Sequence, residues 1–422
     1  MDQFVINGGS PLEGEVTVSG AKNAVLPILA ATVLGDGQSV INNVPKLHDV
    51  KVMKEVLENL GAKVQDDSEQ IMIDTSTVNC CEIPENLMRK MRATVFLMGP
   101  LVARFGKVKI SQPGGCSIGP RPIDLHLKGL EALGVEFKQR HGALEGTVDQ
   151  LVGAEIHLDF PSVGATENIM MAATKAEGET LIYNAAKEPE IIDLQNYLNR
   201  LGASIRGAGT NVIKVKGVQE LQAVEYQVIP DRIEAGTFLV AAAITKGNVI
   251  IKDVIPEHIE PVIAKLNEAG IEMKVEHNQI EVIGKEDWKG INIKTLPYPG
   301  LPTDMQAQLM TFLSLAEDTS IITENIFENR LSHADELRRM GAKIRIEGNT
   351  AIVNGVDKLY GTNVRATDLR AGAALVLAGL AAEGETIIEN IYHIDRGYEY
   401  LEDKLSNLGA DIIRKSDFSS ED

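Results

Sequence analysis

A short glycine-centred signature recurs along the 422-residue chain and constrains its fold more than any other feature. Its first copy is Asn-Leu-Gly-Ala-Lys-Val, which ends at Val64, and its last is Asn-Leu-Gly-Ala-Asp-Ile. The spacings between successive glycines are 73, 68, 68, 71 and 68 residues, and the glycines are Gly61, Gly134, Gly202, Gly270, Gly341 and Gly409. So regular a series predicts six copies of one supersecondary unit.

The residues around each glycine predict the same elements in every copy. A β-branched run about twenty residues before the glycine predicts a strand, as at Ile41 and Ile250. An amphipathic helix follows the run and ends at the glycine, which suits the position just after a helix. Another helix precedes the run and is apolar nearly all round, as in residues 23–34, 236–244 and 371–382. Because a helix without a polar face must be buried on every side, we expect these helices in the core.

Each copy therefore has the order strand, buried helix, strand, amphipathic helix, strand, strand, and the predicted fold class is α/β. Six such units exceed one hydrophobic core, so we expect two lobes of three units, with helices inside and sheets outside. The first lobe is predicted to span residues 22–229. The second is predicted to contain residues 1–21 plus 230–422, with the N-terminal strands completing the last unit. The cleft between the lobes is the expected ligand site.

Charge and composition exclude several classes of protein. The net charge of −19 argues against a nucleic-acid binder, which needs a broad basic surface. No run approaches the roughly 18 apolar residues of a membrane helix, and the N-terminus does not resemble a secretory signal. The cysteines, Cys80, Cys81 and Cys116, fit neither a disulfide framework nor a zinc site. We therefore expect a cytoplasmic protein without a metal or redox cofactor and without nucleic-acid or membrane partners.

Cations interrupt the apolar pattern at the starts of three of the buried helices, at Lys22, Arg92 and Arg370. The helix dipole is already positive there, so each cation is unfavourable by up to about 1 kcal/mol. An anion across these helix starts would reverse the sign. For any one residue alone, a solvated charge or a salt bridge is the favoured alternative. Three equivalent positions favour an anion site.

Three further arginines, Arg121, Arg330 and Arg396, precede the amphipathic helices. A guanidinium can bind phosphate or carboxylate with two parallel hydrogen bonds. We therefore expect a ligand that carries one or both of these groups.

One loop, residues 112–122, belongs to the second copy alone, and six of its eleven residues are glycine or proline. This composition predicts a mobile lid. Cys116 lies in the loop five residues before Arg121, which is the setting of an activated thiol. Cys80 and Cys81 are interpreted as buried small hydrophobic residues. Three isolated histidines, His126, His333 and His393, have a catalytic role as one alternative, but a capping or hydrogen-bonding role is favoured.

Several motifs resemble the UDP-N-acetylglucosamine enolpyruvyl transferases. Besides the 112–122 loop they are Ser-Gly-Ala-Lys-Asn-Ala (19–24), Pro-Asp-Arg-Ile-Glu-Ala-Gly-Thr (230–237), Pro-Thr-Asp-Met-Gln-Ala-Gln (302–308), Phe-Glu-Asn-Arg (327–330), Ala-Thr-Asp-Leu-Arg-Ala (366–371) and His-Ile-Asp-Arg-Gly-Tyr-Glu (393–399). The similarity runs from Met1 to about Arg414. It implies the fold of that family, a two-lobed inside-out α/β barrel.

The resemblance also implies a reaction and site residues. The enolpyruvyl group of phosphoenolpyruvate would move to the 3′-hydroxyl of UDP-N-acetylglucosamine without a cofactor, the first committed step of peptidoglycan precursor synthesis. Cys116 would donate a proton and Asp304 would accept the hydroxyl proton. The residues implied to hold phosphoenolpyruvate are Lys22, Arg121, Arg396, Arg330 and Arg370. Those implied at the sugar nucleotide are Asn23, Arg92, Pro122, Asp124, Leu125, Ser162, Val163, Gly164 and Phe327, supported by Glu188, Asp231 and Asp368.

Two departures concern the nucleotide pocket. Phe96 stands where the family often has tryptophan, and Phe160 where some members have lysine. Three alternatives are weighed against this function: a transferase that acts on shikimate 3-phosphate, a silent paralogue that binds UDP-sugar, and a scaffold of repeated sheets. The cysteine loop argues against the first alternative. The intact set of Lys22, Cys116, Asp304 and Arg396 argues against the second, and the charge and the single decorated loop argue against the third.

Overall fold

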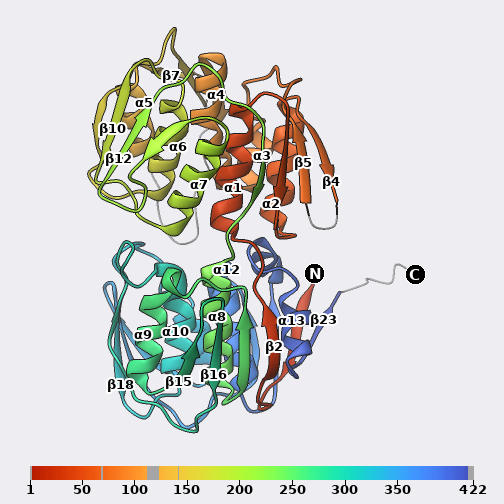
Figure 1. Cartoon of the computed structure of the whole chain (residues 1–422). Helices are drawn as coiled ribbons and strands as arrows, with labels where there is room; N and C mark the ends of the chain where they lie inside the picture. The colour runs from red at the N-terminus through yellow and green to blue at the C-terminus, as the bar shows by residue number, and fades with distance from the viewer. Residues whose placement is uncertain (1, 68–69, 112–122, 141, 417–422) are drawn as a thin grey trace. The chain divides into compact units, whose positions relative to one another are not determined.

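The computed structural model describes residues 2–67, 70–111, 123–140 and 142–416 (Figure 1). The described residues form two compact units. The N-terminal unit contains residues 20–111 and 123–229, with the gaps just given, and the C-terminal unit contains residues 2–19 and 230–416. Among the described residues the chain therefore passes between the units after Ser19 and after Ile229.

Three small sheets are described in the N-terminal unit, and two of them are four-stranded and mixed. In spatial order the first contains β13 (Glu225–Gln227), β3 (Gln38–Asn42), β5 (Gln70–Asp74) and β4 (Lys63–Asp66). The second contains β11 (Ser204–Arg206), β12 (Val212–Lys216), β10 (Glu179–Tyr183) and β9 (Glu155–His157). The third is antiparallel and contains β6 (Lys107–Ser111), β8 (Ala143–Thr147) and β7 (Glu136–Arg140).

Helices of two kinds alternate with these strands. The buried kind comprises α1 (Lys22–Ala31) with η1 (Thr32–Leu34), η2 (Arg92–Leu97) with α4 (Met98–Phe105), and α6 (Val163–Ala173). In α1 every residue except Asn23 is buried, as its apolar sequence predicts. The amphipathic kind comprises α2 (His48–Asn59), α5 (Asp124–Ala132) and α7 (Pro189–Arg200), and a short helix, α3 (Glu85–Lys90), precedes η2.

The C-terminal unit repeats this organisation with three mixed four-stranded sheets among its described residues. The first contains β15 (Glu272–Val275), β16 (Gln279–Ile283), β14 (Asn248–Lys252) and β2 (Glu13–Thr17). The second contains β17 (Ile293–Lys294), β18 (Thr319–Thr323), β20 (Thr350–Asn354) and β19 (Lys343–Glu347). The third contains β21 (Asn363–Arg365), β22 (Glu385–Glu389), β1 (Gln3–Asn7) and β23 (Asp411–Lys415).

The core of the C-terminal unit forms where three helices contact one another. These are α8 (Arg232–Ile244), α10 (Gln306–Leu313) after η4 (Thr303–Met305), and α12 (Leu369–Ala381). All 13 residues of α8 are buried. Among the described residues no helix is long and apolar enough to cross a membrane. The remaining helices are η3 (Pro256–His258), α9 (Glu260–Ala269), α11 (Ala334–Arg339), η5 (Ile391–Arg396) and α13 (Leu401–Asn407).

The predicted role of the recurring glycines is confirmed. Each follows the end of an amphipathic helix, and all six have φ between +94° and +108°. Residues with a Cβ atom rarely adopt this conformation, whereas glycine adopts it readily and so reverses the chain after the helix.

The prediction for the N-terminal strands is half correct. β1 pairs with β22 and β23 and completes the last sheet, as expected. β2 does not, because it pairs in parallel with β14. The corresponding strand from the middle of the chain, β13, pairs in parallel with β3. The chain leaves the C-terminal unit just after β2 and the N-terminal unit just after β13. Each of these strands therefore pairs within the unit that precedes the crossing.

Candidate functional site

The predicted site residues of the N-terminal unit gather at the starts of its helices. Helix α1 contacts η2 and α7, and α6 contacts η2, α5 and α7, so these helices form one packed group. The residues at their starts are Lys22 and Asn23 in α1, Arg92 in η2, Asp124 and Leu125 in α5, Val163 and Gly164 with the cap Ser162 in α6, and Glu188 just before α7.

Lys22 has a carboxylate partner at the start of α1. Its Nζ lies 2.8 Å from Oδ2 of Asp49, and only 8% of Lys22 and 2% of Asp49 are exposed. The structure thus contains the salt bridge that was the alternative to an anion site. Asp49 was missed by the sequence analysis, although an acid in the first turn of α2, beside buried Val50, was a usable signal.

His126, Asn168 and Gly164 pack against one another at α6. Asn168 accepts a hydrogen bond from the amide of Gly99 at 2.7 Å, which fixes its amide group, and its Nδ2 donates to Nδ1 of His126 at 2.8 Å. The neutral ring therefore carries its proton on Nε2. Burial, helped by the charge of Arg92, lowers the pKa of His126 to about 4. The interpretation of this histidine as a hydrogen-bonding group is confirmed.

Gly164 packs closely against two rings. A Cβ atom there would lie 3.0 Å from Cε1 of His126 and 3.1 Å from Cε1 of Phe96. Phe96 thus lines the same corner, whereas Phe160 is 44% exposed. Ser162 caps α6 by accepting the amide hydrogen of Ala165 at 3.4 Å.

The cysteine predictions have mixed outcomes. Cys80 and Cys81 are half-buried rather than buried, because the chain at 80–82 runs along the edge of β6, where Glu82 and Lys109 form an isolated bridge. Burial raises the pKa of the Cys81 thiol. Cys116, Arg121 and Pro122 lie outside the described residues, together with the whole predicted lid.

Asp304 organises the predicted cations of the C-terminal unit. It lies in η4, and its two carboxylate oxygens bind two different arginines: Oδ1 is 2.7 Å from Nη2 of Arg330, and Oδ2 is 3.0 Å from Nη2 of Arg370. Burial alone would raise the pKa of Asp304, but Arg370 and Arg330 outweigh burial and hold it well below its ordinary value. Asp304 is therefore an anion over the whole neutral range.

Arg370 offers an unused donor beside this ion pair. The residue is 2% exposed, and its Nε and Nη2 both bind Asp304. Its buried Nη1 has no hydrogen-bond partner among the described residues. An orphaned donor on a buried cation is rare in native proteins, and a bound anion would satisfy it.

Arg330 is also fixed by its neighbours. It lies four residues before α11 rather than at its start, Nη1 donates to Oγ1 of Thr303 at 3.0 Å, and its guanidinium lies 5.3 Å from the ring centre of Phe327. The Thr303 hydroxyl in turn donates to Glu324 at 2.9 Å. These contacts bring the predicted residues Asp304, Phe327, Arg330 and Arg370 together.

The two predicted supporting aspartates are helix caps. Asp231 accepts the amide hydrogens of Ile233 and Glu234 at 2.7 and 3.0 Å at the start of α8. Asp368 accepts those of Arg370 and Ala371 at 2.9 and 3.1 Å at the start of α12. Arg396, half-buried, is the last residue of η5.

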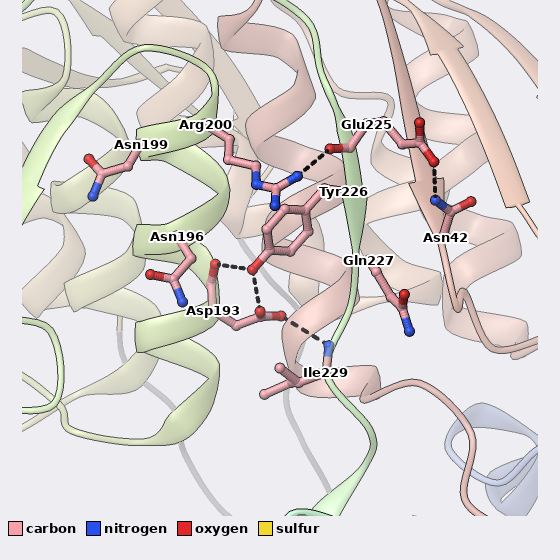
Figure 2. A pocket seen from close by; sticks show the side chains of 9 residues that line it. All are labelled: Asn42, Asp193, Asn196, Asn199, Arg200, Glu225, Tyr226, Gln227 and Ile229. Atoms are coloured by element: carbon pink, nitrogen blue, oxygen red, sulfur yellow. Dashed lines mark hydrogen bonds between the residues drawn. The ribbon is translucent and has the colours of Figure 1, made fainter. Parts of the chain in front are cut away.

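A pocket of about 820 Å³ in the N-terminal unit contains none of the predicted site residues (Figure 2). It is bounded by α7 and by the segment that returns to the C-terminal unit. Tyr226 donates a 2.5 Å hydrogen bond to buried Asp193, which also accepts the amide hydrogen of Ile229 at 3.4 Å. Burial raises the pKa of Asp193 to about 6, although the Tyr226 hydrogen bond opposes the rise. These two hydrogen bonds to Asp193 connect the returning segment to α7.

Comparisons with known proteins show which family the chain belongs to. The family described as EPSP synthase (3-phosphoshikimate 1-carboxyvinyltransferase) matches residues 6–405. UDP-N-acetylglucosamine 1-carboxyvinyltransferase 1 of Caldanaerobacter subterraneus is 55% identical over 413 residues, which cover 98% of this chain and 99% of the relative. The enzyme of Geotalea uraniireducens with that name is 54% identical over 414 residues, 98% of this chain and 99% of the relative. The chain belongs to the UDP-N-acetylglucosamine 1-carboxyvinyltransferase family.

Two solved structures share the fold of this chain. The enolpyruvyl transferase NikO from Streptomyces tendae matches with a TM-score of 0.89 at 26% identity, over 98% of this chain and 99% of that one. EPSP synthase from Acinetobacter baumannii matches with a TM-score of 0.77 at 20% identity, over 99% of this chain and 100% of that one, which shows the fold alone. The chain is thus an α/β protein built from small sheets, six of them among its described residues.

Proposed function

We propose that this chain transfers the enolpyruvyl group of phosphoenolpyruvate to the 3′-hydroxyl of UDP-N-acetylglucosamine and releases phosphate. The observation that carries the proposal is the identity of about 55% over nearly the full length of relatives that bear this activity in their names. The step would commit the sugar nucleotide to peptidoglycan precursor synthesis.

The cations support an anionic donor substrate. Phosphoenolpyruvate carries a phosphate and a carboxylate, and Arg370 has a buried donor without a partner in the described part of the chain. We propose that Lys22, Arg121 and Arg396 hold phosphoenolpyruvate and that Arg330 and Arg370 help them. Bidentate guanidinium groups suit both of its anionic groups.

The proposed chemistry is an addition followed by an elimination. Protonation of C3 of the enol by Cys116 leaves positive charge at C2, which the sugar 3′-oxygen attacks while Asp304 accepts the hydroxyl proton. The resulting tetrahedral phospho-ketal loses a proton from C3 and then phosphate, which leaves the enol ether. The reaction needs an acid, a base and fixed cations.

The ion pairs of Asp304 bear on its role as the base. A carboxylate held by two guanidinium groups has a lowered pKa and is a weak base. We propose that the substrate anion draws Arg330 or Arg370 away from Asp304, so that its basicity rises only when phosphoenolpyruvate is bound. This coupling would keep the base inactive in the empty enzyme.

The remaining predicted residues receive supporting roles in the proposal. Glu188, Asp231 and Asp368 would shape the site, the latter two by fixing the starts of α8 and α12. The residues proposed to line the UDP-sugar site are Asn23, Arg92, Pro122, Asp124, Leu125, Ser162, Val163, Gly164 and Phe327.

We also propose the finer architecture that the repeats predict. The two units would be the two domains of an inside-out α/β barrel, each with three repeats of about 70 residues, and close in extent to residues 22–229 and to residues 1–21 plus 230–422. The contacts among the buried helices α8, α10 and α12 support this arrangement. The cytoplasm is the proposed compartment of the reaction.

Phosphate release from phosphoenolpyruvate tests the proposed function, with UDP-N-acetylglucosamine or shikimate 3-phosphate as the acceptor. We expect release with the UDP-sugar alone, strongly reduced by Cys116→Ser. Release with shikimate 3-phosphate instead would assign the other activity of this fold. Binding of the UDP-sugar without release would indicate a silent paralogue.

A further inference from the structure

The side chain of Asn168 enters the junction between η2 and α4. In a continuous α-helix the amide of Gly99 would donate to the carbonyl of Val95, four residues earlier. Here that amide donates to Oδ1 of Asn168 at 2.7 Å, and Nδ2 of Asn168 donates to the Val95 carbonyl at 3.0 Å. The carboxamide from α6, which is completely buried, thus takes the place of one helical hydrogen bond. A Cβ atom on Gly99 would lie 2.3 Å from the backbone oxygen of Asn168, so only glycine allows this close approach.

The two backbone groups determine which end of the Asn168 carboxamide is oxygen. A backbone N–H can only donate and a carbonyl can only accept, so Oδ1 faces Gly99 and Nδ2 faces Val95. The second hydrogen of Nδ2 is left for Nδ1 of His126, which is 2.8 Å away. Asn168 therefore makes Nδ1 an acceptor and places the proton of the neutral ring on Nε2. The ring is neutral at pH 7, because burial and then the charge of Arg92 lower the pKa of His126 to about 4.

The protonated nitrogen of His126 lies beside the first turn of α6. A Cβ atom on Gly164 would be 3.3 Å from Nε2. His126 is 8% exposed, and Nε2 has no hydrogen-bond partner in the part of the chain that the structure describes. The N–H is therefore available to an acceptor that reaches the start of α6.

Other groups at this corner are donors as well. The amides of Val163 and Gly164 open α6, and helix geometry gives them no acceptor within the helix. Arg92 lies close enough for its charge to lower the pKa of His126. A corner with several donors suits a ligand that is rich in acceptor oxygens, and a sugar nucleotide is such a ligand.

We infer that Asn168 is a positioning residue of the proposed transferase, which holds His126 so that its Nε2–H donates to an oxygen of UDP-N-acetylglucosamine. The inference rests on the proposed function, in which the start of α6 lines the UDP-sugar site. Asn168 acts through His126, because its own side chain is completely buried. Without the carboxamide, the proton is free to move to Nδ1, and Nε2 then presents a lone pair to the ligand oxygen. Every residue in this chain of contacts belongs to the N-terminal unit.

NMR of the wild-type protein with isotope-labelled histidine tests the inference without any change to the fold. Long-range correlations between ring hydrogens and ring nitrogens should show Nδ1 of His126 unprotonated and Nε2 protonated, with the signals assigned by their loss in His126→Ala. Added UDP-N-acetylglucosamine should shift the Nε2 signal more than the Nδ1 signal. A ring protonated on Nδ1, or an Nε2 signal that does not respond to the UDP-sugar, would overturn the inference.

Asn168→Leu removes the carboxamide at similar volume. The same spectra should then show both tautomers of His126. The Kd for UDP-N-acetylglucosamine, measured by titration calorimetry, should rise about tenfold, the upper range for one neutral hydrogen bond. The KM for phosphoenolpyruvate should stay within about twofold, because a loss of overall structure would affect both substrates.

Asn199→Leu is the matched control for the structural part of the effect. Asn199 also accepts one backbone hydrogen bond and donates another, both at 2.8 Å and both with Ile205. Its replacement should destabilise the protein, but it should leave the His126 ring unchanged and the Kd for the UDP-sugar within about twofold. A rise in Kd equal to that of Asn168→Leu would show that general destabilisation explains both variants.

His126→Ala removes the donor and leaves Asn168 in the helical junction. It should raise the Kd for UDP-N-acetylglucosamine at least as much as Asn168→Leu, and the double variant should bind no more weakly than His126→Ala alone. Additive losses would mean that Asn168 does not act through His126. If wild type binds no UDP-sugar, the proposed function fails, whereas an unchanged His126 ring in Asn168→Leu would refute the positioning role itself.

Discussion

Asp304 binds two arginines that are far apart in the sequence. Its Oδ1 lies 2.7 Å from Nη2 of Arg330, and its Oδ2 lies 3.0 Å from Nη2 of Arg370. Both arginines are at least 95% buried, so the carboxylate supplies the negative charge that they need inside the unit. A buried charge that loses its partner is strongly destabilising. Asp304 therefore has a structural role as well as its proposed chemical one.

Asp304→Asn should lower the free energy of unfolding by about 3 kcal/mol at pH 7. It should also reduce turnover at least about a hundredfold, the usual effect of a lost general base. Urea denaturation and phosphate release measure the two effects. Asp335→Asn is the matched control, because Asp335 pairs with Arg338 at the surface, and it should change stability by less than about 0.5 kcal/mol.

The stability difference between wild type and Asp304→Asn should depend on pH in one direction. The folded pKa of Asp304 is lowered, so its contribution is fully present above the ordinary value of 3.8 and is lost as pH falls through the folded pKa. The difference should be constant between pH 5 and pH 8 and should shrink below about pH 3.8. A difference that grows towards low pH would contradict the lowered pKa.

Glu167 should behave in the opposite way. It is completely buried in α6, and neither carboxylate oxygen has a partner in the part of the chain that the structure describes. Burial, then the charges of Glu190 and Glu188, raise the pKa of Glu167 well above 4.5. The unfolded chain therefore loses this proton at a pH where the folded chain retains it, and wild-type stability falls as pH rises above 4.5.

Glu167→Gln keeps the shape and removes this titration. Its stability relative to wild type should increase steadily from pH 5 to pH 7, by up to about 1.4 kcal/mol per pH unit. Thermal or urea unfolding across this range measures the trend. Glu131→Gln, at an exposed position of α5, should show no such trend. A flat difference for Glu167→Gln would mean that Glu167 is ionised in the folded protein.

Tyr226→Phe should raise the pKa of Asp193 above its value of about 6. The phenol donates a 2.5 Å hydrogen bond to this buried carboxylate, and that bond is the largest effect opposing burial. Carboxyl carbon shifts in a pH titration by NMR measure the change. Because the folded pKa already exceeds 3.8, wild-type stability should fall between about pH 4 and pH 6, and the variant should extend this fall to higher pH. An unchanged titration would show that the hydrogen bond does not govern Asp193.

Asp231→Ala should destabilise the protein by about 1–2 kcal/mol through loss of the cap of α8. Asp231→Asn retains an oxygen that can accept the same amide hydrogens, and it should recover most of that loss. Chemical denaturation of the two variants distinguishes capping from a role of the negative charge. If Asn is as harmful as Ala, the charge of Asp231 matters more than its cap.

The repeating elements could be predicted from the sequence because each depends on local patterns. Periodicity predicts the apolar and the amphipathic helices. Glycine is the residue that most readily adopts the positive φ found after these helices, as at Gly61. The sheets that β2 and β13 join could not be predicted, because they depend on where the chain crosses between the units.

Two of the predicted cations, Arg330 and Arg370, lie together on Asp304, but this pairing was not predicted. Arg330 and Arg370 stood out because charge breaks an apolar pattern, and Asp304 came from the family motif. Asp49 and Lys404 looked like ordinary charges on amphipathic helices, and only the fold brings them to Lys22 and Ser19. The position of Asp49 in the first turn of α2 hinted that it matters, but which distant cation it meets had to come from the structure.

The partners of β1 and of β2 determine when each sheet of the C-terminal unit can form during synthesis. The N-terminal unit has all its described strands once Gln227 has left the ribosome. The C-terminal unit needs strands from the first 17 residues and from the last, because β1 sits between β22 and β23. During translation β2 therefore waits for β14, and β1 waits with unpaired edges until β22 and then β23 have been made. A truncation before Asp411 would leave β1 with a neighbour on one side only, and the newborn N-terminus would keep an open edge for other chains to join.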